Sequence, residues 1–180
     1  MKNPFAFTTG ELVTIGLFAG ASKAASLMVA LLGGGPNPIT LLLRNAVLAA
    51  LMMVLLIKVT RPGTLTLSTL VSVLLGLFLL GSATLSLPGI IMACIIAEIF
   101  MVALAPLNRP ILTAAVGVAV SELLRRGVSL GMSYLTLREQ PELLIPSVIL
   151  MGFSYIGILL GIYGGFRMSK ELRHAGLIQN

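Results

Sequence analysis

Six long apolar stretches, separated by short polar or Pro/Gly-rich connections, dominate the pattern of hydrophobic and polar positions along the chain. These stretches are too long and too uniformly apolar for alternating barrel strands, and a helix satisfies its own backbone hydrogen bonds in lipid. Because about 20 apolar residues cross a bilayer, six crossings use roughly 120 residues. The pattern predicts an all-α membrane protein in one domain, residues 1–180, with six transmembrane helices at about 12–32, 39–57, 64–80, 89–107, 111–134 and 147–166.

Composition favours the same class, because 57% of the residues are hydrophobic and only 10% are charged. Such a chain has too little polar surface to cover a soluble domain. A cleaved signal peptide is an alternative for the first apolar stretch, because Lys2 precedes it and it contains Ala19-Gly20-Ala21. The stretch continues to Leu32, which is longer than a usual signal core, so we expect a retained first helix.

Lys and Arg outnumber Asp and Glu by 12 to 6, which gives a net charge of +6. Most of the basic residues outside the expected spans fall in connections on one side of the membrane. The positive-inside rule therefore places both termini in the cytoplasm, and no nucleic-acid partner is needed to explain the basic excess. The residues on this side are Lys2, Lys58, Arg61, Arg109, Arg167, Lys170 and Arg173.

The residues needed for most enzyme chemistry are missing from the sequence. A single cysteine, Cys94, and a single histidine, His174, exclude an internal disulfide and a Cys/His zinc cluster. The chain has no Gly-rich phosphate loop followed by Lys-Ser/Thr, and Glu98 and Glu122 have no histidine companions. We therefore expect no enzyme activity, no metal site and no cofactor.

Six charged residues fall inside the expected spans, where each would cost about 2.5–3.5 kcal/mol if it faced lipid. Pairing within the protein is one interpretation, since Glu122 precedes Arg125 and Arg126 by three and four residues and Glu98 could neutralise Lys23 or Arg44. The expected spans still contain four basic residues and only two acidic ones. This surplus favours an outward-facing pocket for an anionic group such as a carboxylate or phosphate.

Small residues follow a helical spacing in the first span. Gly16, Gly20 and Ala24 form one ridge, with Ala21 and Ala25 beside it. Such a ridge lets another helix approach closely in lipid. The partner helix could belong to the same chain or to another protein.

Two segments carry a resemblance to a known family: Glu11–Ala21 (ELVTIGLFAGA) and Leu160–Leu177 (LGIYGGFRMSKELRHAGL). Together with the six short spans, they resemble the substrate-specific S components of energy-coupling factor (ECF) transporters, and in particular the Trep_Strep-like branch. The resemblance implies a multi-pass subunit of the bacterial plasma membrane that captures a micronutrient outside the cell. A T component and two ATPase subunits would supply the energy, and the S component would topple to carry its site inward.

The resemblance also implies roles for particular residues. In S components an Ala-x-x-x-Ala pattern in the first helix docks the T component, and Gly16 and Gly20 occupy the matching positions here, with Ala21, Ala24 and Ala25 as neighbours or as a shifted register. The ligand would be a vitamin, a tetrapyrrole or a chelate, and an anion is favoured. Substrate-binding residues would come from the first connection and the outer ends of later spans, which hold Asn37, Arg44, Asn45, Ser82, Thr84, Arg125, Arg126, Ser129, Tyr134 and Arg138.

Two other functions stay open on the sequence. A self-sufficient small transporter or channel could use Lys23, Glu98 and Glu122 as a proton or ion relay. Duplicated halves would favour it, but residues 1–88 and 89–180 show no convincing similarity. A structural or assembly subunit without a ligand is the other alternative.

Overall fold

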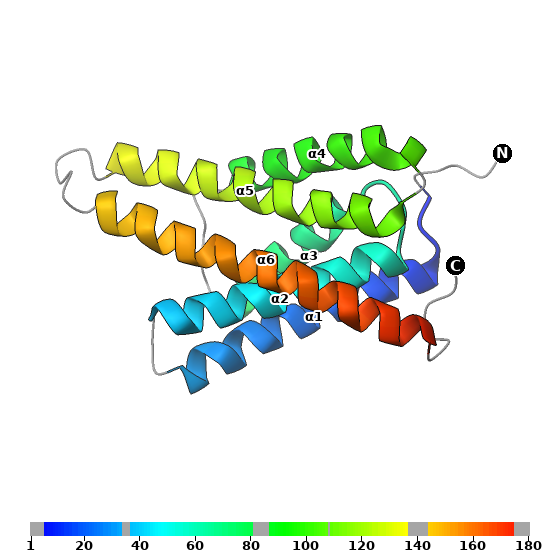
Figure 1. The fold of residues 1–180 in the computed structure, drawn as a ribbon, viewed down its shortest axis with the longest axis horizontal. Helices are drawn as coiled ribbons and strands as arrows, with labels where there is room; N and C mark the ends of the chain where they lie inside the picture. Colours follow the sequence, from blue (N-terminus) through cyan, green and yellow to red (C-terminus); the bar gives the residue numbers. More distant parts are fainter. Residues whose placement is uncertain (1–5, 34–36, 81–86, 108, 137–143, 175–180) are drawn as a thin grey trace.

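The computed structural model describes residues 6–33, 37–80, 87–107, 109–136 and 144–174. These ranges contain six α-helices, one 3₁₀ turn and no strand, which confirms the prediction of an all-helical protein (Figure 1). The elements are α1 (Thr9–Leu32), α2 (Pro38–Lys58), α3 (Thr64–Leu80), α4 (Leu87–Leu104), η1 (Ala105–Leu107), α5 (Pro110–Thr136) and α6 (Leu144–His174).

Four of the helices, α1, α2, α4 and α6, are long and apolar enough to cross a membrane. The described apolar part of α3, Thr64–Phe78, is shorter. α5 has 27 residues, but every 18-residue stretch within it includes Glu122, Arg125 and Arg126. Many large apolar side chains also point outward from the helices, Leu31, Leu32 and Phe78 among them. Such a surface is suited to lipid rather than to water.

Polar residues set the beginnings of the first two helices. Thr8 and Glu11 form a capping box at the start of α1, in which the Thr8 backbone N–H donates to Glu11 Oε2 at 2.7 Å. The other Glu11 oxygen accepts from Arg61 Nε at 2.6 Å, which ties this turn to the connection between α2 and α3. Asn37 caps α2, where its Oδ1 accepts from the Thr40 N–H at 2.7 Å.

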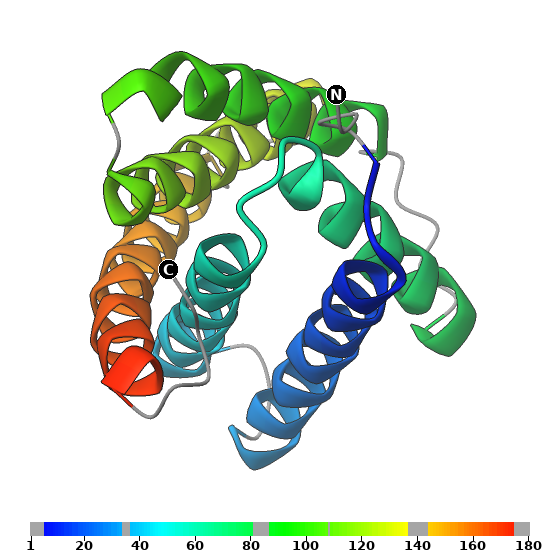
Figure 2. The same cartoon turned by 90° about the vertical axis from the view of Figure 1, so that its right-hand side faces the viewer.

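The helices run alternately between two ends of the molecule, and the first turn of α1 lies at the same end as the last turn of α6 (Figure 1). The view along the helices in Figure 2 shows α2 beside α6, α4 beside α5 and α1 beside α3, and these pairs are in contact. The largest core cluster lies among α2, α4, α5 and α6, and Leu65 of α3 joins it. It includes Met53, Leu56, Ala97, Val118 and Ile158.

Glycines on one face of α6 bring its backbone against α2. A Cβ atom placed at Gly157 would collide with the backbone carbonyl oxygen of Leu42, and one at Gly161 with that of Ala46. Gly165, one turn further on, has the same relation to α2, since a Cβ there would lie 2.7 Å from Met53 Cβ. The spacing of four residues places these glycines on one helical face, as in small-xxx-small packing of membrane helices.

The ends of two helices differ from the sequence prediction. The last span was expected to end near Phe166, but α6 continues to His174, so Arg167, Lys170 and Arg173 are helical. The expected span 89–107 ends in the 3₁₀ turn η1. Helix ends are decided by a few capping and packing contacts, which hydropathy does not report.

Candidate functional site

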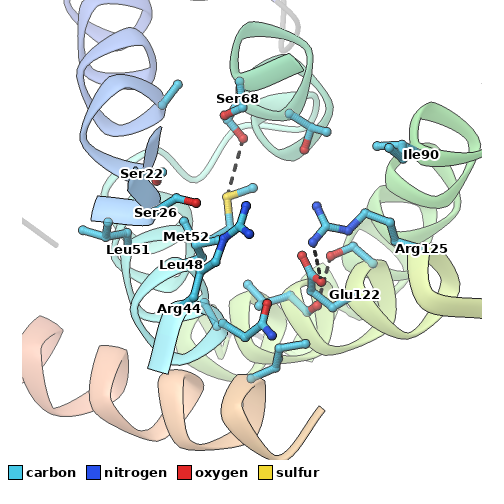
Figure 3. Close-up of a pocket in the computed structure, with 18 of the residues that line it drawn as sticks. Ser22, Ser26, Arg44, Leu48, Leu51, Met52, Ser68, Ile90, Glu122 and Arg125 are labelled. Atoms are coloured by element: carbon cyan, nitrogen blue, oxygen red, sulfur yellow. Dashed lines mark hydrogen bonds and ion pairs between the residues drawn. The ribbon is translucent and has the colours of Figure 1, made fainter. Parts of the chain in front are cut away.

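A cavity of about 480 Å³ lies between the helices, and all six α-helices contribute residues to its lining. Its volume falls in the range typical of small-molecule sites. Figure 3 shows Arg44 of α2 and Arg125 of α5 directed into the cavity from different sides, with serines of α1 and α3 nearby. The polar and charged lining residues are Ser22, Lys23, Ser26, Arg44, Asn45, Ser68, Thr69, Ser72, Ser121, Glu122, Arg125, Arg126, Ser129 and Ser154.

One carboxylate, Glu122, lies among the basic groups of this lining. Its Oε2 accepts from Arg125 Nη2 at 2.8 Å and lies 3.9 Å from Arg126 Nη2. The pairing follows from the helical spacing of three and four residues, as the sequence predicts. Because Glu122 carries one charge, it neutralises only one of these two arginines.

Lys23 and Arg44 reach the same cavity from α1 and α2. Within the described parts of the chain, neither side chain has a hydrogen bond or an ion pair. Lys23 extends to α3, where a Cβ built at Gly76 would lie 3.0 Å from its Nζ. Because Gly76 has no side chain, there is room for the Lys23 ammonium group at this position.

Arg126 differs from these two cations because the fold holds it. Its Nη1 donates to the hydroxyl of Ser154 on α6, and Asn45 Nδ2 of α2 donates to the same hydroxyl at 2.5 Å. Ser154 is 1% exposed, so this network joins α5, α6 and α2 in the interior. Arg126 Nε is buried and has no hydrogen-bond partner in the structure as described. The Arg126 side chain is thus mainly part of the cavity wall.

Hydroxyl groups form another part of the lining, on α1 and α3. The hydroxyls of Ser22, Ser26 and Ser72 make no hydrogen bond to any residue that the structure describes. In contrast, Ser68 Oγ donates to the carbonyl oxygen of Leu65 at 3.0 Å, and Thr69 Oγ1 accepts from the Cys94 thiol at 3.4 Å. Three hydroxyls on this side of the cavity are therefore available to a ligand.

The structure brings five of the expected substrate-binding residues together in this lining: Arg44, Asn45, Arg125, Arg126 and Ser129. Two others lie elsewhere. Asn37 caps α2 and also donates from Nδ2 to the Gly33 carbonyl oxygen at 2.9 Å, and Tyr134 is 58% exposed. Ser82, Thr84 and Arg138 lie outside the described residues.

Sequence reasoning missed the hydroxyl side of the cavity. Ser22 and Ser26 are four residues apart on α1, as Ser68 and Ser72 are on α3, so each pair lies on one helical face. Polar residues at that spacing in an otherwise apolar helix were the sequence signal that could have predicted this side of the cavity. Lys23, singled out as a costly intramembrane charge, lies beside the first of these pairs.

Glu98 forms no ion pair with Lys23 or Arg44 among the described residues, so the pairing that the sequence left open is not found. Glu98 Oε1 accepts from the backbone N–H of Thr66 at 2.9 Å, in the first turn of α3, where free N–H groups favour a carboxylate. Glu98 also lines a second pocket, of about 430 Å³, together with Arg61 and Arg109. The surplus of positive charge in the first cavity is therefore larger than the sequence suggested.

The small residues of α1 lie away from close helix contacts. Nothing lies within 4 Å of a Cβ atom built at Gly16 or Gly20, so neither glycine is needed for packing against a described part of the chain. Ala21 and Ala24 are exposed, whereas Ala25 is half-buried. This face of α1 is open to an external partner or to lipid.

No group of three His, Cys, Asp or Glu side chains among the described residues could hold a metal ion. Neither a family model, nor a curated protein, nor a solved structure matches this chain.

Proposed function

We propose that this chain is the substrate-binding S component of an ECF-type ABC importer. It captures an anionic micronutrient at the extracytoplasmic side of a bacterial plasma membrane and delivers it by toppling. Separate ATPase subunits and a T component supply the energy. The observation that supports this proposal most strongly is one cavity, lined by all six helices, whose described lining holds four basic residues, Lys23, Arg44, Arg125 and Arg126, and one carboxylate, that of Glu122.

The electrostatics of the cavity support an anionic ligand. Unpaired cations are costly in a poorly hydrated site, and an anion replaces water there with charge-assisted hydrogen bonds worth roughly 1.5–3 kcal/mol each. Since Lys23 and Arg44 make no hydrogen bond or ion pair with the described residues, both can bind a ligand without breaking an existing contact.

Two further features support a subunit that depends on partners. The 180 residues contain no phosphate-binding loop, which agrees with an energy supply from ATPase subunits. The face of α1 around Gly16 and Gly20 is free of close contacts, as a docking face for a T component requires.

Reconstitution in liposomes tests the energy source. The chain alone is expected to bind its ligand without accumulating it, and accumulation is expected to require ATP together with an ECF T component and ATPase subunits. Uptake against a gradient by the chain alone, driven by protons or sodium, would instead support a self-sufficient transporter.

The ion-relay alternative has less geometric support. Lys23 and Glu122 line the main cavity, whereas Glu98 lines the second pocket and bonds to the start of α3. A relay through these three residues would have to pass between two pockets. A structural subunit without a ligand would show no anion binding at all.

A further inference from the structure

The charge count of the main cavity restricts the kind of anion that it can hold. Lys23, Arg44, Arg125 and Arg126 contribute four positive charges to the described lining, and Glu122 contributes one negative charge. The excess is therefore three positive charges. A ligand with one negative charge would leave two of them uncompensated, which is unfavourable in a site of low dielectric.

The placement of the cations leads to the same conclusion. Arg125 shares Glu122 with Arg126, while Lys23 and Arg44 come from two other helices and have no hydrogen bond or ion pair with the described residues. Figure 3 shows Arg44 and Arg125 entering the cavity from different helices, so cationic groups reach a ligand from more than one side. Cationic groups from three helices around one cavity match a ligand that carries more than one anionic group.

The remaining lining indicates what joins those anionic groups. Ser22, Ser26 and Ser72 present free hydroxyls, and Leu48, Leu51 and Leu55 supply apolar surface. Phe18 is the one aromatic side chain in the described lining. A planar aromatic ligand is often held between two aromatic side chains, and the described lining supplies a single one.

We infer that the cavity binds a compact, non-aromatic molecule with two or more negative charges, of the polycarboxylate or phosphate-ester kind. This inference rests on the proposed function, because it names the substrate class of the same site. On this inference, flavin-like, pterin-like and other flat aromatic vitamins bind more weakly than a compact dianion.

A matched set of small probes tests the inference on the purified full-length protein. Succinate and butyrate share a four-carbon chain and differ by one carboxylate, so the ratio of their affinities measures the value of the second charge. Phthalate places two carboxylates on an aromatic ring, and glycerol 3-phosphate with glycerol as its control separates a phosphate ester from carboxylates. Affinity is measured by isothermal titration at low salt and again at high salt.

The expected result is at least about tenfold tighter binding of succinate or glycerol 3-phosphate than of butyrate, a difference of about 1.4 kcal/mol. High salt should reduce this ratio, since screening weakens the second charge pair. Which of the two dianions binds more tightly decides between a carboxylate and a phosphate ligand.

Lys23→Gln and Arg44→Gln provide the test on the protein side. Each substitution removes a cation that has no hydrogen bond or ion pair with the described residues. Glu122 therefore keeps its contact with Arg125 in both variants. Both variants should bring the succinate-to-butyrate ratio closer to one. Arg173→Gln, on the exposed last turn of α6, is the matched control and should leave the ratio unchanged.

The outcomes separate this inference from the proposed function. Equal affinity for succinate and butyrate, or tightest binding of phthalate, would overturn the substrate class while leaving an anion-binding site in place. Failure of every anion to bind at millimolar concentration, or equal binding of glycerol, would overturn the proposed anion site and this inference together.

Discussion

Gly161 of α6 lies so close to Ala46 of α2 that a methyl group on residue 161 would overlap the Ala46 carbonyl oxygen. This contact lies between Gly157 and Gly165 on the face that joins α6 to α2. Helices in lipid lack a hydrophobic drive to associate, so close packing of this kind supplies much of their interaction. The pair thus places α6 at a short fixed distance from the helix that carries Arg44.

Gly161→Ala is expected to destabilise the protein by about 1–3 kcal/mol, because the added methyl group forces the two backbones apart. Gly164→Ala is the matched control on the same helix, since nothing lies within 4 Å of a Cβ atom there. It should be neutral or slightly stabilising, because alanine favours helix over glycine. Thermal unfolding in one detergent measures both. Equal melting temperatures for the two variants would show that the α2–α6 contact is looser than described.

Gly16→Leu and Gly20→Leu should abolish association with the T component while the solitary protein keeps its melting temperature and its succinate binding. The physical reason is that a Cβ atom built at either glycine has no neighbour within 4 Å, so leucine would project into the space where the T component is proposed to dock. Copurification after coexpression with an ECF T component and its ATPases measures the association. Gly152→Leu, at an equally open position on α6, serves as the control and should still copurify. Lower stability of the Gly16 or Gly20 variants would mean that the ridge packs inside the chain.

Arg126→Gln and Arg44→Gln should affect different properties. Arg126 donates to Ser154, which also accepts from Asn45, so its removal weakens a buried network between three helices and should cost about 1–3 kcal/mol of stability. Arg44 is exposed to the cavity without a recorded partner among the described residues, so its removal should leave the melting temperature unchanged.

The Arg44→Gln substitution should affect ligand binding rather than stability. Arg44→Gln should weaken succinate binding by about tenfold, the loss of one charge-assisted contact. Unchanged succinate affinity in this variant, with the protein still folded, would assign Arg44 to the structure rather than to the site.

The thiol of Cys94 reports the charge of the cavity, because it is the single cysteine of the sequence and it lies in the cavity lining. An anionic methanethiosulfonate reagent should modify it at least about tenfold faster than a cationic one, after correction for their rates with a free thiol, since excess positive charge concentrates anions. Mass spectrometry of the intact protein measures the rates. High salt should reduce the preference.

Cys94→Ala is the control for labelling at this site. Because Cys94 is 4% exposed, Ser72→Cys in the Cys94→Ala background offers a second thiol in the same lining. A preference for the cationic reagent at both positions would contradict the positive cavity.

The sequence by itself determined the class of the protein and the approximate position of each helix. The apolar runs and the Pro and Gly residues between them act locally, and backbone hydrogen bonding in lipid leaves the helix as the available structure. The Glu122–Arg125 pair was predictable for the same reason, since three residues along a helix bring two side chains together whatever surrounds them.

Only the tertiary structure decided which side chains share the cavity and which α6 glycines meet α2. Helices that are apolar nearly all round give no clear signal of their rotation, so the sequence left open that Ser22, Lys23 and Ser72 face one space. It also could not assign Glu98, whose partner is the Thr66 backbone N–H on another helix. Every residue except proline has a backbone N–H, so the sequence does not indicate which N–H a carboxylate will contact. The contact between Glu98 and the Thr66 N–H, 32 positions away, depends on how α3 and α4 pack.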